Sequence, residues 1–321
     1  MVGHSEHAWR VLARKYGADI CYTEMVHAEV FLRINAVAEN NRWFTTDKDD
    51  RPLVVQICGN KPELMLAAAR KLERHCDAID VNLGCPQNIA KRGHYGAFLQ
   101  DDWSLVGSIV SLLSQNLRVP VFCKIRIFED VDRTVEYARM LETCGCSLLA
   151  VHGRRREQRG VSSGLASWRH IRAVKAALGI PVVANGNILE FADIGECVSF
   201  TGCDGVMVAE THLHNPLVFS GLAASPVEVF SEYLCICESI KGSRPNNIRP
   251  HFFKVFHVIL RALPHYMEDA LRCTTVDEYR RLLGSIEREV RGLDTGQQRH
   301  LMALHPRIRD YRRTVAELVL L

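Results

Sequence analysis

The sequence predicts an α/β protein made of a barrel of parallel strands and helices, followed by an all-helical domain. Between residues 53 and about 222, short runs rich in β-branched residues alternate with stretches of helical periodicity. This alternation is typical of β–α units in a parallel sheet. From about residue 228 onward the strand-like runs stop and helical stretches follow one another. We therefore expect a barrel domain at 1–225 and a helical domain with the C-terminal tail at 226–321.

Seven strands are expected in the first part, one near 19–23 and six at 53–57, 78–81, 121–125, 148–151, 181–184 and 205–208. Its helices are expected near 5–16, 62–75, 102–117, 132–144, 167–178 and 190–200, and those of the second part at 228–240, 250–263, 266–272 and 275–291. A (β/α)8 barrel needs eight strands. Because the helix at 5–16 has no strand before it, we expect the missing first strand to precede residue 1.

Composition and cysteine usage exclude several classes of protein. The chain has 321 residues, of which 47% are hydrophobic and 24% charged, and no apolar run reaches the roughly 18 residues of a membrane span. The N-terminus lacks the basic start and apolar stretch of a signal peptide. The twelve cysteines include no Cys-x2-Cys pair, so we expect reduced thiols and no metal. These features predict an intracellular protein without a membrane partner. We also expect a monomer, located in the cytoplasm or the nucleus.

Positive charge is concentrated near the C-terminus. Residues 1–240 hold 25 basic and 28 acidic side chains, whereas residues 241–321 hold 15 and 9. A basic helical region indicates an anionic macromolecule as partner. A solvated helical surface would give the same charge distribution.

Polar side chains follow five of the predicted strands, where the active site of a barrel lies. They are Gln56, Asn82 with Cys85, Lys124 with Arg126, His152 with Arg154, and Asn185-Gly186-Asn187. A single polar residue at a strand end usually has a structural role, but five strands that all end in this way indicate a functional site. A lysine beside a flat heterocycle would stabilise its anionic reduced form, and the Asn-Gly-Asn turn lets the backbone approach a phosphate. No Gly-x-Gly-x-x-Gly or Walker sequence is present, so a Rossmann or P-loop site is not expected. Beyond Cys85, the glycines and basic residues of 91–97 predict a flexible basic loop.

Six segments together resemble the tRNA-dihydrouridine synthases. They are TEMVHA at 23–28, VQICG at 55–59, DVNLGCP at 80–86, CKIR at 123–126, VHGR at 151–154 and ANGN at 184–187. The run 85–101 and the LHNP at 213–216 are similar to the eukaryotic branch that acts on uridines 16 and 17. The resemblance covers roughly residues 1–290.

The resemblance implies an FMN-binding TIM barrel with a C-terminal tRNA-binding helical domain. It also implies an oxidoreductase that uses NADPH to reduce uridine 16 or 17 of the tRNA D-loop, with Cys85 protonating C5 of the uracil. The positions that match flavin contacts of the family are Met1, Val2, Gln56, Lys124, His152, Asn185, Gly186, Asn187, Ala209 and Glu210. Candidates for contacts with the substrate are Asn82, Lys91, Arg92, Arg126 and Arg154.

Two departures from the family pattern leave alternatives open. The family's first strand ends in Ala-Pro-Met-Val, whereas this chain opens on Met1-Val2, and many members carry Gly-Arg where this chain has Ala209-Glu210. One alternative is an inactive RNA-binding homologue that lacks the first strand. Another is a flavin-dependent barrel that acts on a small molecule, which the basic helical region disfavours.

Overall fold

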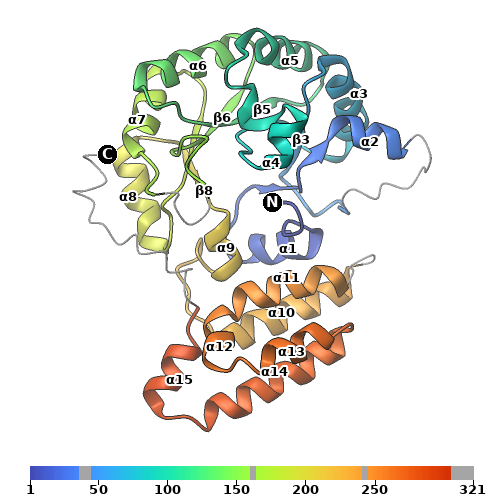
Figure 1. The fold of residues 1–321 in the computed structure, drawn as a ribbon, viewed down its shortest axis with the longest axis vertical. Coiled ribbons are helices and arrows are strands. Elements are labelled where there is room, and N and C mark those ends of the chain that lie inside the picture. Colours follow the sequence, from blue (N-terminus) through green and yellow to red (C-terminus); the bar gives the residue numbers. More distant parts are fainter. Residues whose placement is uncertain (36–44, 160–163, 241–244, 305–321) are drawn as a thin grey trace.

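The computed structural model describes residues 1–35, 45–159, 164–240 and 245–304. A curved parallel sheet with helices on its outer face forms one part of the molecule, and a group of helices forms the other (Figure 1). None of the helices in these ranges is both long and apolar enough to cross a membrane.

All ladders of the sheet are parallel, and its strands follow the order β1-β3-β4-β5-β6-β7-β8, with β2 also paired to β3. The strands are β1 (Cys21–Tyr22), β2 (Val26–His27), β3 (Leu53–Cys58), β4 (Ala78–Leu83), β5 (Val121–Arg126), β6 (Leu148–His152), β7 (Val182–Asn185) and β8 (Gly205–Met207). Within the described residues, β1 and β8 are the edges of the sheet and no ladder joins them. The predicted fold class, a TIM barrel without one strand, is thereby confirmed.

The helices that follow the strands cover the outer face of the sheet (Figure 1). They are α2 (Ala28–Asn35), α3 (Pro62–Leu72), α5 (Trp103–Asn116), α6 (Val131–Thr143), α7 (Trp168–Ala177) and α8 (Phe191–Thr201). Side-chain caps fix three of the helix starts, since Asp102, Asp130 and Ser167 each accept a backbone N–H of the first turn. Buried Val, Ile and Leu side chains of strands and helices form one continuous core between the two layers.

The segment after β4 differs from its expected form. The glycines and basic residues of 91–97 predict a flexible loop, but the structure has α4 (Asn88–Gly93) followed by the 3-10 helix η2 (Gly96–Leu99). A second 3-10 turn, η1 (Glu73–His75), extends α3. The prediction was wrong because His94 and Gly96, both with positive φ, punctuate helical turns here rather than an open loop.

The remaining helices form a second hydrophobic cluster. They are α10 (Pro226–Ser239), α11 (Pro245–Val255), α12 (His257–Ala262), α13 (Tyr266–Arg272), α14 (Val276–Arg291) and α15 (Thr295–Leu301). The helix predicted at 250–263 is divided at Phe256 into α11 and α12, and α15 was not predicted.

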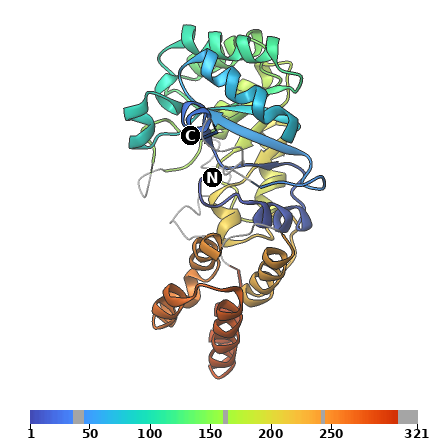
Figure 2. The same cartoon turned by 90° about the vertical axis from the view of Figure 1, so that its right-hand side faces the viewer.

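The N-terminal helix α1 (His7–Lys15) contributes Trp9 and Leu12 to this cluster rather than to the core of the sheet. In both views α1 and α9 (Glu210–His214) lie between the sheet and the other helices (Figures 1 and 2).

Aromatic and polar contacts join α1 to the helical part. The Trp9 ring stacks on the His251 ring with centroids 3.8 Å apart, and its Nε1 donates to His212 Nδ1 at 3.1 Å. Glu6 accepts a hydrogen bond from the Tyr233 hydroxyl at 2.6 Å and pairs with His251 at 2.9 Å. Because these groups come from both ends of the sequence, their contacts fix the helical part against the barrel.

Buried His212 makes the stability of the protein depend on pH. Burial lowers the pKa of His212 to about 4, while an unfolded histidine has a pKa of about 6.5. Between these values the unfolded state binds a proton that the folded state does not, so stability falls as pH falls. From pH 7 to pH 5 the loss from this group is about 2 kcal/mol. In urea denaturation, His212→Gln should lose less free energy of unfolding than the wild type over this interval, by about that amount. Equal losses would contradict the assignment.

Candidate active site at the barrel mouth

The ladders of the sheet place the predicted polar residues on one face, in a row across neighbouring strands. Asn82 of β4 lies opposite Lys124 of β5, and Arg126 of β5 lies opposite His152 of β6. His152 in turn lies opposite Asn185 of β7. Residues paired across parallel strands point to the same side of the sheet. The structure therefore brings together side chains that are up to about one hundred residues apart in sequence.

The backbone around Cys85 is held from two directions. Asn82 Oδ1 accepts the backbone N–H groups of Gly84 at 3.1 Å and of Cys85 at 2.9 Å. The Cys85 carbonyl accepts the Ala97 N–H at 3.1 Å. The Cys85 side chain is half-buried and its thiol is free. The backbone of Cys85 is thus fixed just beyond the end of β4, and its side chain is only partly buried.

Lys124 is a cation without a counter-ion in the described part of the chain. Its ammonium makes no ion pair there. Burial, and then the charge of Arg126, lower the pKa of Lys124 to about 8, although Asp80 and Cys85 act in the opposite direction. A buried ammonium without an ion pair in the described residues favours the binding of an anionic ligand.

Arg126 is buried, and its guanidinium donates hydrogen bonds to the loops at the mouth. Its Nε donates to the Gly84 carbonyl at 2.8 Å, and its Nη1 donates to the carbonyls of Arg155 at 2.9 Å and Gln158 at 3.1 Å. Burial, and then the charge of Arg154, lower the pKa of Arg126 to about 10, so it remains charged near neutral pH. Backbone carbonyls therefore occupy three of its N–H donors, and fewer donors remain for a substrate.

His152 is neutral, and its tautomer follows from its partner. Burial, and then the charges of Lys124, Arg126 and Arg154, hold the pKa of His152 well below its usual range. Arg154 Nη1 lies 3.1 Å from His152 Nε2. Since a guanidinium only donates, Nε2 accepts and the ring proton is on Nδ1. His152 can therefore donate a hydrogen bond to a ligand from Nδ1.

The turn after β7 has the compact form that its Asn-Gly-Asn sequence predicts. Gly186 has φ +115°, and a Cβ there would lie 2.6 Å from the Ala166 Cβ. Asn187 also has positive φ, and its Oδ1 accepts from Arg154 Nη2 at 3.2 Å. Asn185 Nδ2 donates to the Met207 carbonyl at 2.7 Å. The amides of both asparagines thus support the turn itself.

These residues fit a flat anionic cofactor such as FMN. The mouth offers an ammonium without a counter-ion in the described residues, a neutral imidazole with a free donor, and a glycine turn that no side chain could replace. No group of three or more metal-ligating side chains comes together within the described ranges.

The other candidate residues lie around this centre. The Met1 amine donates to Ser5 Oγ at 2.5 Å, and burial lowers its pKa to about 6. The Gly3 N–H donates to Glu24, between β1 and β2, at 2.9 Å, so this segment lies at the mouth. Val2 is exposed, as are Lys91 and Arg92 on α4. Ala209 precedes α9, and Glu210 acts on the pKa of His214 in the junction with the helical part.

A residue that sequence reasoning missed is Asp80, which is completely buried on β4. Burial raises the pKa of its carboxyl to about 7. An aspartate inside an otherwise apolar run, two residues before Asn82 on the same face of the strand, was the signal that could have identified it.

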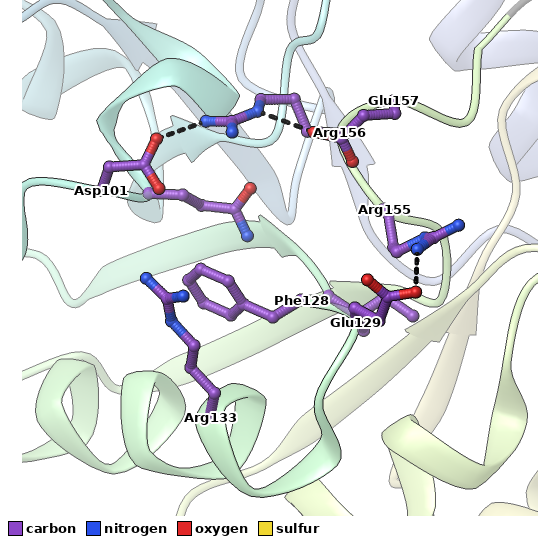
Figure 3. Close-up of a pocket in the computed structure, with 9 residues that line it drawn as sticks. Asp101, Phe128, Glu129, Arg133, Arg155, Arg156 and Glu157 are labelled. Carbon is purple, nitrogen blue, oxygen red and sulfur yellow. Dashed lines mark hydrogen bonds and ion pairs between the residues drawn. The ribbon is translucent and has the colours of Figure 1, made fainter.

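A pocket of about 340 Å³ opens at the rim, beside the loops that Arg126 joins (Figure 3). Its lining comprises Gln100, Asp101, Ile127, Phe128, Glu129, Arg133, Arg155, Arg156 and Glu157. Arg155 pairs with Glu129 at 2.6 Å, Arg156 pairs with Asp101 at 2.7 Å, and the Arg133 guanidinium lies 4.6 Å from the centroid of the Phe128 ring. The pocket is thus close to neutral, and its ion pairs hold the rim loops together.

Gly96 should be essential for the position of Cys85. It has φ +65°, and a Cβ would lie 2.8 Å from the Cys85 carbonyl oxygen and 2.9 Å from the Cys85 Cβ. We expect Gly96→Ala to lower the free energy of unfolding by about 1–3 kcal/mol, as measured by urea denaturation. Gly195→Ala is the matched control, because Gly195 lies within α8 with no atom in reach of a Cβ, and this change should be neutral or stabilising by up to about 1 kcal/mol. Equal effects of the two substitutions would contradict the packing argument.

Comparison with known proteins identifies the family. The family model described as dihydrouridine synthase (Dus) matches residues 1–302. A Mus musculus protein named tRNA-dihydrouridine(16/17) synthase (NAD(P)(+))-like is 48% identical over 277 residues, covering 86% of this chain and 58% of its own length. The Saccharomyces cerevisiae tRNA-dihydrouridine(16/17) synthase (NAD(P)(+)) is 44% identical over 283 residues, covering 84% of this chain and 66% of its own length. A Homo sapiens protein named tRNA-dihydrouridine(20a/20b) synthase (NAD(P)+)-like is 36% identical over 239 residues, with 74% of each chain covered.

The chain therefore spans about three fifths of the length of the mouse relative. The resemblance deduced from the six sequence segments is confirmed by a match over nearly the whole chain. With the barrel and the polar strand ends in place, this chain belongs to the dihydrouridine synthase family.

Proposed function

We propose that this protein reduces uridine in tRNA, at positions 16 and 17 of the D-loop, to dihydrouridine, with FMN at the barrel mouth and NADPH as the reductant. The observation that carries the proposal is that Cys85, just beyond the end of β4, and Lys124, on neighbouring β5, lie at the carboxyl ends of adjacent strands. The relatives that are 44–48% identical to this chain over aligned segments of 277 and 283 residues carry the corresponding name.

FMN, when bound, would supply the hydride for the reduction. The chain's own residues would bind the cofactor and orient its ring. Lys124 would place its charge beside the ring, and the Nδ1–H of His152 would donate to it. The turn at Gly186 would let the backbone approach the phosphate end of the cofactor. Gln56, whose amide bonds to Asp80 and Asn82, keeps one N–H for the ring.

The uracil must leave its stack before it can lie at the mouth. Cys85 would hold the proton that C5 of the uracil receives, acting as the general acid. Asn82 donates one of its two amide hydrogens to Gln56, and the other remains for a uracil carbonyl. These roles leave Arg126 to hold the loops and Arg154 to set the tautomer of His152.

The tRNA would be bound by its phosphates and its shape. Lys91 and Arg92 are exposed on α4, close in sequence to Cys85. Lys254 of α11 and Arg261 of α12 belong to the basic C-terminal region. We assign residues 1–225 to the catalytic domain and 226–321 to the tRNA-binding domain and tail. The monomeric state and the cytoplasmic or nuclear location stay predictions.

The experiment that tests this function is direct. The purified chain, supplemented with FMN and NADPH, is incubated with an unmodified tRNA transcript, and nuclease fragments are analysed by mass spectrometry. A gain of two hydrogens at uridine 16 or 17 supports the proposal. A flavin-free protein that binds tRNA would indicate an inactive homologue, and a bound flavin with no change in the tRNA would indicate a small-molecule enzyme.

Cys85→Ala should remove the general acid. We expect kcat for dihydrouridine formation to fall by about 10²–10⁴-fold, while flavin and tRNA binding persist. The matched control is Cys235→Ala, which removes an exposed thiol on α10 and should leave the rate unchanged. A wild-type rate for Cys85→Ala would show that another group supplies the proton.

Lys124→Met should weaken flavin binding, because it removes a charge that lacks a counter-ion in the described residues. We expect the Kd for FMN to rise by about 10- to 100-fold, as measured by flavin fluorescence. Since the pKa of Lys124 is about 8, wild-type affinity should fall as pH rises through this value and the ammonium loses its proton. Lys71→Met, at an exposed site on α3, should change neither quantity. Unaltered affinity in Lys124→Met would exclude this role.

A further inference from the structure

Fully buried Asp80 stands at one end of a chain of hydrogen bonds that reaches the backbone of Cys85. Gln56 Nε2 donates to Asp80 Oδ2 at 2.9 Å. Asn82 Nδ2 donates to Gln56 Oε1 at 2.9 Å. Asn82 Oδ1 then accepts the N–H groups of Gly84 and Cys85. Three side chains on two neighbouring strands therefore connect the floor of the barrel to the thiol-bearing loop.

The direction of every hydrogen bond in this series is fixed by the groups at its two ends, the backbone N–H groups and the Asp80 carboxyl. A backbone N–H only donates, so Asn82 must turn its oxygen toward Gly84 and Cys85 and its nitrogen toward Gln56. Gln56 must then accept at its oxygen, and its nitrogen faces Asp80. Asp80 must accept. The chain needs a hydrogen-bond acceptor at position 80, and a negative charge is not required for it.

Packing alone does not account for an aspartate at this position. Its second oxygen, Oδ1, is buried and has no hydrogen-bond partner among the described residues, and such an atom destabilises a folded protein. Burial also raises the pKa of the carboxyl to about 7, which reflects the cost of keeping it charged. Asp80 therefore does not stabilise the core in the way that an apolar residue would.

We propose that Asp80 is a positioning residue: by orienting Gln56 and Asn82 it sets the place of the Cys85 thiol at the barrel mouth. Without an acceptor at position 80, the Gln56 amide loses its fixed orientation. Asn82 then loses its partner, and the N–H groups of Gly84 and Cys85 lose theirs. The effect on the reaction rate rests on the proposed function of Cys85, whereas the effect on the thiol's position rests on the hydrogen bonds alone.

Two substitutions at position 80 separate the acceptor from the charge. Asp80→Leu has no acceptor and should break the chain. Asp80→Asn keeps an acceptor oxygen for Gln56 and should preserve it. The control for a general loss of buried polar contacts is Thr201→Val. Thr201 is buried at the end of α8, at the opposite end of the barrel from the mouth, where its hydroxyl donates to the Cys197 carbonyl at 2.7 Å.

The first measurement is the rate at which iodoacetamide alkylates Cys85, followed by peptide mass spectrometry. Exposed Cys235 provides the internal reference. We expect Asp80→Leu to raise the rate at Cys85 by about tenfold and to leave Cys235 unaltered, because a loop that has lost its hydrogen bonds exposes the half-buried thiol to the reagent. Asp80→Asn and Thr201→Val should match the wild type at both cysteines.

The second measurement is steady-state dihydrouridine formation. Asp80→Leu should lower kcat by about 10- to 100-fold while KM for tRNA stays within about threefold. Asp80→Asn should restore kcat to within about threefold of the wild type. If Asp80→Leu does not fold, Gln56→Leu breaks the same chain at its middle and must produce the same change in Cys85 alkylation.

Two results would overturn the proposal. One is wild-type alkylation and kcat in Asp80→Leu, or wild-type alkylation in Gln56→Leu where that variant replaces it. The other is an Asp80→Asn variant as impaired as Asp80→Leu, which would assign the effect to charge. If the wild type forms no dihydrouridine but the alkylation pattern holds, the proposed function fails and the positioning role of Asp80 stands.

Discussion

The guanidinium of Arg126 is the group on which the arrangement of the mouth depends. It is buried at the end of β5 and donates to Gly84 in the loop after β4 and to Arg155 and Gln158 in the loop after β6. A charged group in this position is very costly unless its donors are used. The backbone carbonyl of Arg126 also accepts from buried Gln100, at 2.8 Å. The connections after β4 and after β6 thus share one centre, and moving either of them would leave some donors of a buried charge without partners.

The same arrangement determines the electrostatics of the site. Lys124, Arg126 and Arg154 all act on His152 and keep its ring neutral. Arg126 also disfavours the charged form of Lys124. Positive charge therefore accumulates where no carboxylate pairs with Lys124 in the described residues, in a region of low dielectric. An anionic ligand would relieve this repulsion, which is the physical reason that the proposed flavin and the proposed RNA substrate suit the same mouth.

The sequence predicted the parts of the fold that periodicity determines, and missed those that depend on distant contacts. All six strands from 53 to 208 were predicted near their observed places, whereas two-residue β2 carries no periodic signal. The polar strand ends were identified because parallel strands finish at one edge of a sheet. The hydrogen bonds of Asp80 and Arg126 were not, since their partners lie on other strands and loops. Likewise, nothing local shows that α1 packs with helices more than two hundred residues away.

That packing of α1 connects the mouth to the helical part. The segment before α1 lies at the mouth, since the Gly3 N–H donates to Glu24, between β1 and β2, at 2.9 Å. Glu6 of the same segment binds Tyr233 and His251 of the helical part. Trp9, one turn further on, stacks on the same histidine. Fewer than ten residues therefore link the cationic mouth to the helices of the second hydrophobic cluster. The proposed tRNA substrate, in contact with both parts, would be held at a fixed distance from Cys85, because the intervening contacts are buried and leave little freedom for relative motion.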